Sequence, residues 1–269
     1  MKYTKQEHTN VTVVGDALSQ GVRRENINKV VHGHGDVSII NNQTWTRYFE
    51  AYYASIHNLS IAGASNTRSV RRVIEKLEHV KDEDAHNHIV VWQISHPRNN
   101  ELHNADYNFW LQYDYIQDKV FIDDLDYHID CPPHIQKIAD DSLEYFRSAD
   151  KMYSAKYINN KFFESAIMMQ EWCNKRKIRL LTITANKSRL PWDDIYHRFT
   201  TTYNWLTERH IISDALTTDD FLGDKEDLID HEATKNHDFI APNRMGYKYM
   251  ADNIWKRLDM LNWIHKPDE

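Results

Sequence analysis

The stretch Val11-Thr-Val-Val-Gly-Asp-Ala-Leu-Ser-Gln-Gly21 decides the fold that this sequence predicts. Its first four residues form a β-branched run that is typical of a short buried strand. Gly15 then permits a sharp turn, and Asp16 stands where its side chain can accept from the first free N–H groups of a helix. The stretch therefore predicts a strand, a tight turn and the start of a helix.

Such an elbow is a place where α/β proteins present reactive groups, because the N-terminus of a helix directs N–H donors toward a developing negative charge. A nucleophile would stand at the tip, at position 17. The chain has Ala17 there, and alanine has no nucleophilic atom.

Further apolar runs alternate with helical patterns along the chain. Strands are predicted at 57–61, 89–94 and 178–183, and helices at 69–80, at 135–175 with a polar gap near 154–160, and from 247 to 261. This alternation predicts an α/β fold in which about five parallel strands lie between two layers of helices. We expect a single domain over 1–269, in which the irregular segment 104–135 is an insertion or a lid-like element.

Composition excludes several classes of function. A net charge of −7 gives no general attraction to nucleic acid, no apolar run is long enough for a membrane span, and sixteen histidines lack metal-ligand spacing. We therefore expect no metal, no cofactor, no nucleic-acid partner and no membrane. The absence of an apolar leader and the two cysteines favour the cytoplasm, or that of a host cell for a viral protein. A basic group, Arg68, Arg71, Arg72 and Lys76, is typical of a solvated helix face.

Two stretches resemble sequence blocks of the SGNH (GDSL) hydrolases. Gly15-Asp-Ala-Leu-Ser19 resembles their Gly-Asp-Ser-Leu block, with Ala17 at the position of the nucleophilic serine. Asp238-Phe-Ile-Ala-Pro-Asn-Arg-Met-Gly-Tyr247 resembles their last block, with Ala241 at the position of the catalytic histidine. The blocks are spaced over nearly the whole chain, and the resemblance implies a flavodoxin-like three-layer fold.

Two weaker matches complete the resemblance. Asn58-Leu-Ser-Ile-Ala-Gly-Ala-Ser-Asn66 is similar to the second block, whose glycine, Gly63 here, helps to line an oxyanion hole. After the third strand the family has Gly-x-Asn-Asp, whereas this chain has Ser95-His-Pro-Arg-Asn-Asn100. That is similar to a divergent, partly viral subgroup, matched here by Trp92, Ser95, Arg98 and Glu101. The side chain that replaces the usual asparagine donor is left open among Asn99, Asn100 and Arg98.

The resemblance implies the chemistry of a serine ester hydrolase. A serine at position 17 would attack an acyl or acetyl ester, a histidine at 241 would be the general base, and Asp238 would orient it. Asp16, Ser95, His96 and Arg98 are the candidate substrate-binding residues. A carbohydrate ester is one candidate substrate, since Tyr107, Phe109, Trp110 and Tyr113 would form either an aromatic platform or the core of a subdomain.

The two alanines leave two interpretations open. Intact flanking blocks and two replacements by alanine favour deliberate inactivation of an enzyme; a natural pseudoenzyme that binds a ligand or a partner is the alternative. Ser19 is no substitute nucleophile, because residues two apart on a helix point in different directions, and we expect it to pack or to cap. His237 is expected to face away from position 17. A dinucleotide-binding protein is disfavoured because no Gly-x-Gly-x-x-Gly follows the first strand.

Overall fold

The structure is a computed structural model. It describes residues 9–15, 19, 44–49, 55–61, 63–115, 118–123, 133–184, 216–217, 225–231 and 242–263. The candidate residues Asp16, Ala17, Asp238 and Ala241, and also His237, lie outside these ranges.

Five parallel strands form the main sheet, in the order β2-β1-β3-β7-β8. Their bounds are β1 Asn10–Val14, β2 Ser55–Asn58, β3 His88–Ile94, β7 Arg179–Thr184 and β8 Leu216–Thr217. Counted along the chain, the order of the strands in this sheet is 2-1-3-4-5, which is that of flavodoxin-like sheets. The predicted α/β architecture with about five parallel strands is confirmed.

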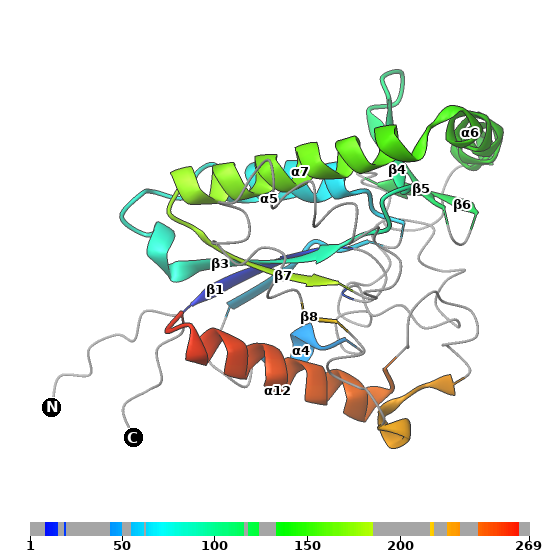
Figure 1. Ribbon diagram of the computed structural model, residues 1–269. Coiled ribbons are helices and arrows are strands. Elements are labelled where there is room, and N and C mark those ends of the chain that lie inside the picture. The colour runs from blue at the N-terminus through cyan, green and yellow to red at the C-terminus, as the bar shows by residue number, and fades with distance from the viewer. Residues whose placement is uncertain are drawn as a thin grey trace, which may run out of the picture.

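Helices cover both faces of this sheet (Figure 1). On one face lie α5 (Asn66–Leu77) and α7 (Ala155–Lys175), and on the other α4 (Thr46–Phe49) and α12 (Arg244–Met260). Alternate residues of the strands point into two apolar cores. Val14, Val90 and Trp92 pack toward α5 and α7, whereas Val11, Val13 and Val91 pack toward α12.

Side-chain caps set the helix bounds that the apolar pattern located only approximately. α5 begins at Asn66, because the Ser65 hydroxyl accepts from the Arg68 N–H. Ser154 caps α7 and separates it from α6 (Pro133–Met152), so the long helical pattern is divided as expected. Asn243 caps α12, accepting from two N–H groups of the first turn. Two short 3-10 helices, η2 and η4, span Ala85–Asn87 and Glu226–Leu228.

A second sheet is antiparallel, with the strand order β4-β5-β6. The strands are β4 Asn100–Asn104, β5 Phe109–Asp114 and β6 Lys119–Asp123. It begins four residues before the predicted insertion at 104. One face is apolar and packs on α6; the residues involved are Phe109, Leu111, Tyr113, Ile122, Ile135, Ala139 and Phe146. The single-domain assignment stays a prediction.

The opposite face of this sheet lies against α5. Here the expectation of a solvated basic face is wrong for Arg68 and Arg71, whereas Lys76 is exposed as expected. Arg68 is buried, with 3% of its surface exposed, and forms two hydrogen bonds to Asp123 of β6. Arg71 pairs with Glu101 of β4 and lies over the ring of Trp110, 4.0 Å from its centroid. The second sheet therefore covers the arginines that helical periodicity alone assigns to solvent.

The four aromatic residues considered as a platform are not on one exposed face. Phe109 and Tyr113 are buried toward α6, and the Tyr113 ring stacks on Phe146. Trp110 points the other way, under Arg71, because successive residues of a strand face opposite sides. Only Tyr107 of the four is largely exposed.

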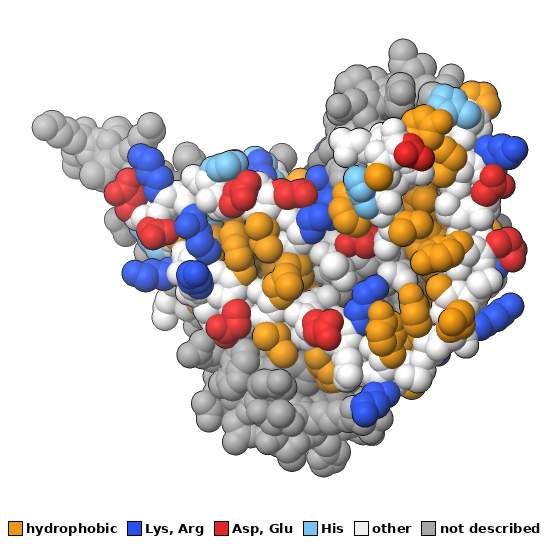
Figure 2. All heavy atoms as spheres, turned by 90° about the horizontal axis from the view of Figure 1, so that it is seen from above, with side chains coloured by type: hydrophobic (Ala, Val, Ile, Leu, Met, Phe, Trp, Pro, Cys, Tyr) orange, Lys and Arg blue, Asp and Glu red, His pale blue; other side chains and the backbone are white. Residues whose placement is uncertain are grey.

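The surface over α6 and α7 mixes hydrophobic and charged side chains (Figure 2). Exposed apolar residues on these helices are Tyr145, Met152, Tyr157 and Met168. Among the described residues, no helix is both long and apolar enough to cross a membrane.

Candidate functional site

The topology points to one place for a site, the edge of the sheet where β1 and β3 end. The chain passes from β1 to β2 on one side and then to β3 on the other, so the strand order reverses between β1 and β3. In open α/β sheets ligands bind outside the carboxyl ends of the strands at this switch point. Gly15 ends β1 there, and Ser95 follows β3.

Ser19 anchors the chain just beyond positions 16–18. Its N–H donates to Gln93 Oε1 at 2.9 Å, and its carbonyl oxygen accepts from Asn58 Nδ2 at 2.8 Å and from Thr44 Oγ1 at 3.1 Å. Its hydroxyl oxygen accepts from Trp45 Nε1 at 3.3 Å. The residue is fully buried. It packs, as the sequence predicts.

Gly15, directly after β1, has a backbone conformation that favours glycine. Its φ is +153°, and a Cβ here would lie 2.5 Å from the Cβ of Gln93. Gln93, on β3, therefore both packs against the turn and holds Ser19. Gln93 was not predicted as a site residue. The local signal that could have indicated it is its polar side chain in an otherwise apolar strand.

The loop after β2, described at residues 59–61 and 63–65, runs back against the end of β1. The Leu59 N–H donates to Val13 O at 2.8 Å, and the Ile61 N–H to Gly15 O at 3.1 Å. Gly63 has a φ of +72°, and an added Cβ would lie 2.8 Å from Phe121 Cδ2. Only glycine fits at this turn. Among the described residues, none accepts a hydrogen bond from the Gly63 N–H.

A paired amide joins this loop to the one after β3. Asn66 Nδ2 donates to the Ser95 carbonyl oxygen at 3.0 Å, and Asn66 Oδ1 accepts from the Ser95 N–H at 2.9 Å. The Ser95 hydroxyl is buried and has no hydrogen-bond partner among the described residues. Asn66 lies at the end of the second matched block, yet it was not predicted as a site residue.

The side chains of Asn99 and Asn100 are both engaged. Asn99 is buried; its Nδ2 donates to Ala64 O at 3.3 Å, and its Oδ1 accepts from the Tyr115 N–H at 3.0 Å. Asn100 Oδ1 accepts from Lys161 Nζ at 2.7 Å. Burial lowers the pKa of Lys161, partly offset by the nearby carboxylates of Glu101 and Glu164.

Arg98 and His96 form a stack with Tyr115 at the same edge. Arg98 Nη1 donates to both carboxylate oxygens of Asp150 at 2.9 Å, and the guanidinium lies 5.0 Å from the Tyr115 ring centroid. The His96 ring is nearly parallel to Tyr115, with 5.1 Å between centroids. Asp150 therefore compensates the charge of Arg98. The side chain that would donate in an oxyanion hole stays open among Asn99, Asn100 and Arg98.

Within the described residues, no three His, Cys, Asp or Glu side chains are arranged to hold a metal ion.

No family model matches the chain, and no curated protein matches it. Similar solved structures include a putative lipolytic protein of the G-D-S-L family from Desulfitobacterium hafniense DCB-2, at 13% identity and a TM-score of 0.43, covering 93% of this chain and 99% of that one. TesA is similar at 14% identity and a TM-score of 0.43, covering 94% and 99%. So is the psychrotrophic esterase EstA from Pseudoalteromonas sp., at 14% identity and a TM-score of 0.42, covering 93% and 99%.

Proposed function

We propose that the chain is the scaffold of an SGNH-type serine ester hydrolase whose nucleophile and base positions, 17 and 241, hold alanine. One observation supports this most. Three segments that resemble blocks of the family are joined at one edge of the sheet, through the hydrogen bond from Ile61 to Gly15 and the paired amide of Asn66 with Ser95. That edge is also the switch point of the sheet.

The proposed reaction is acyl transfer through residue 17. A serine there would attack the ester carbonyl while a histidine at 241 takes its proton and then protonates the leaving alcohol. Asp238 would hold the imidazole. The N–H groups of residue 17 and Gly63 would stabilise the oxyanion, and water would then hydrolyse the acyl-enzyme. The substrate class is a small acyl or acetyl ester, with an acetylated carbohydrate as one candidate.

Restoring both side chains tests this function. We expect the double replacement Ala17→Ser/Ala241→His to hydrolyse p-nitrophenyl acetate at least about 1000-fold faster than the original chain. Each single replacement should give little, because nucleophile and base act as a unit. Circular dichroism and unfolding midpoints control for folding. A folded double variant without activity above the original chain would refute the proposal.

The second candidate function is that of a pseudoenzyme that binds an ester or a partner without chemistry. The observation in its favour is alanine at both positions. The natural coding sequence decides between the two, since serine and histidine codons at 17 and 241 favour the enzyme and varied residues in close relatives favour the binding module.

A further inference from the structure

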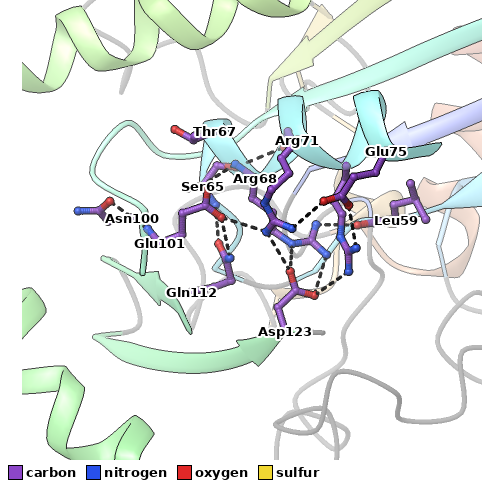
Figure 3. Close-up of polar contacts among 12 residues, drawn as sticks. Leu59, Ser65, Thr67, Arg68, Arg71, Glu75, Asn100, Glu101, Gln112 and Asp123 are labelled. Carbon is purple, nitrogen blue, oxygen red and sulfur yellow. Dashed lines mark hydrogen bonds and ion pairs between the residues drawn. The ribbon is translucent and has the colours of Figure 1, made fainter. Parts of the chain in front are cut away.

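The antiparallel sheet is connected to the Gly63 loop, described at residues 59–61 and 63–65, directly from Gln112 to Ser65 and through Arg68 from Asp123 to Leu59 (Figure 3). We propose that Asp123 and Gln112 of this sheet are positioning residues that hold the Gly63 loop in the geometry needed for an oxyanion donor. The proposal rests on the ester-hydrolase function proposed above and adds two residues that the matched blocks do not contain.

Asp123 holds the beginning of the loop through Arg68. The carboxylate accepts from Arg68 Nε at 2.5 Å and from Nη2 at 3.0 Å, and Arg68 Nη1 donates to the Leu59 carbonyl oxygen at 2.7 Å. Both side chains are about 95% buried. The planar guanidinium therefore transmits the position of β6 to Leu59 with defined geometry.

Gln112 holds the end of the loop. Its Oε1 accepts from the Ser65 N–H at 3.3 Å, and its Nε2 donates to Glu101 Oε2 at 3.0 Å. Glu101 also accepts from Arg71 Nη2 at 3.2 Å. The contact with Glu101 fixes which end of the Gln112 amide faces Ser65, because a carboxylate only accepts.

The tip of the loop rests on the same sheet. Phe121 and Asp114 lie so close to Gly63 that an added Cβ would be 2.8 Å from the first and 3.0 Å from the second. Asn99 holds Ala64 from the other side, through its Nδ2. The beginning of the loop is linked to the sheet through Arg68, and its tip and end contact the sheet directly. The direction of the Gly63 N–H therefore depends on where the sheet sits.

The Asp123 contact is ionic at neutral pH. Burial by itself would raise the pKa of Asp123, but the guanidinium of Arg68, with Arg72 and Arg71 nearby, holds the pKa below its ordinary value. Arg72 Nη2 lies 3.4 Å from Asp123 Oδ1, and Arg71 Nη2 lies 3.8 Å from Oδ2. Removing the charge of Asp123 would leave Arg68 buried without its ionic partner, so the link to Leu59 would weaken.

The turn before β6 offers a matched control. Asp118 also pairs with an arginine, accepting from Arg147 Nη2 at 2.5 Å and from Arg147 Nε at 3.0 Å. The side chains of Arg147 and Asp118 are 38% and 45% exposed, and no hydrogen bond or ion pair among the described residues joins them to the Gly63 loop. Asp118→Asn therefore removes an aspartate–arginine pair beside the second sheet. It leaves in place the contacts through which Asp123 and Gln112 hold the Gly63 loop, which we call the brace.

The test uses the chain restored by Ala17→Ser/Ala241→His, with Asp123→Asn, Gln112→Ala or Asp118→Asn added. Misplacing a catalytic donor lowers the rate of the chemical step, so we expect Asp123→Asn and Gln112→Ala to lower kcat about 10- to 100-fold, with KM changed less than about threefold. Asp118→Asn should leave both within about twofold. A merely structural role would lower the unfolding midpoint and leave kcat of the folded enzyme unchanged, which would overturn the proposal.

Amide hydrogen exchange gives a second measurement, on the original chain with both alanines. Asp123→Asn should speed exchange in residues 59–65, and Asp118→Asn should not. Equal exchange in the two variants overturns the brace. If the restored parent has no esterase activity, the proposed function is overturned and the catalytic role of the brace with it, while exchange still decides whether Asp123 holds the loop.

Discussion

The two sheets of this protein are attached to the same helix by opposite chemistry. α5 packs Val70, Val73 and Leu77 against the parallel sheet. Its arginines face the antiparallel sheet, where Arg68 pairs with Asp123 and Arg71 pairs with Glu101. The polar face of an amphipathic helix is therefore not always its solvent face, since a second layer can supply carboxylates.

The apolar and the charged interfaces of α5 also restrain the two sheets in different ways. Apolar contacts are non-directional and scale with buried area, so they stabilise the parallel sheet without fixing fine geometry. A buried ion pair adds little net stability but holds its partners in a defined orientation. We infer that the first interface carries most of the stability and that the second sets the position of the Gly63 loop.

The largest expected effect is in the apolar interface. Trp92 is fully buried among α5, α7 and the parallel sheet, next to the ring of Phe162. Trp92→Ala should lower the free energy of unfolding by about 4 kcal/mol, through lost burial and a cavity. Urea unfolding measures it. Tyr107→Ala, at a largely exposed aromatic, is the control, and equal losses in the two variants would contradict the assignment.

The charged interface should respond differently to single and double replacement. Arg68→Met leaves Asp123 buried without its closest cation and should cost about 3 kcal/mol. Replacing both, as Arg68→Met/Asp123→Leu, should restore stability to within about 1 kcal/mol of the original, because apolar residues fill the same space. Urea midpoints test both variants. If the double variant is as unstable as the single one, the ion pair contributes stability that apolar packing cannot replace.

The smallest effect concerns pH. Burial lowers the pKa of His57 and of His88, and Lys76 adds to the effect on both. A lowered pKa means that the folded state binds fewer protons than the unfolded state. The free energy of unfolding therefore has its full value above about pH 6.5, the ordinary pKa of histidine, and decreases as the pH falls below it. His88→Asn should reduce the fall in the urea midpoint between pH 7.5 and 5.5.

Asp123→Asn should leave that pH dependence unchanged, because the pKa of Asp123 lies below its ordinary value of 3.8 and the group stays ionised throughout this range. The pH response is thus assigned to His57 and His88 on strands of the parallel sheet. This assignment would be contradicted if Asp123→Asn changed the dependence of the urea midpoint on pH, or if His88→Asn left it unchanged.

Much of the framework could be predicted, and the polar contacts of the site could not. The β-branched runs located the strands, and the polar gap that contains Ser154 located the division between two helices. The apolar pattern placed the starts of α5 and α12 at 69 and 247, three residues after their capped starts at Asn66 and Arg244. Gln93 and Asn66 were missed, because a single polar residue beside an apolar run has the same local sequence whether it lines a site or faces solvent. The roles of positions 17, 238 and 241 stay predictions.

The sequence by itself determined the parallel sheet, its helices and the glycine turn after the first strand, because those follow from periodicity and from local backbone preferences. Only the tertiary structure decided that Arg68 is buried and that Gly63 is wedged against Phe121. Arg68 and Asp123 are 55 residues apart in the chain, and no local pattern links them. They pair because the second sheet packs across α5 in the folded chain.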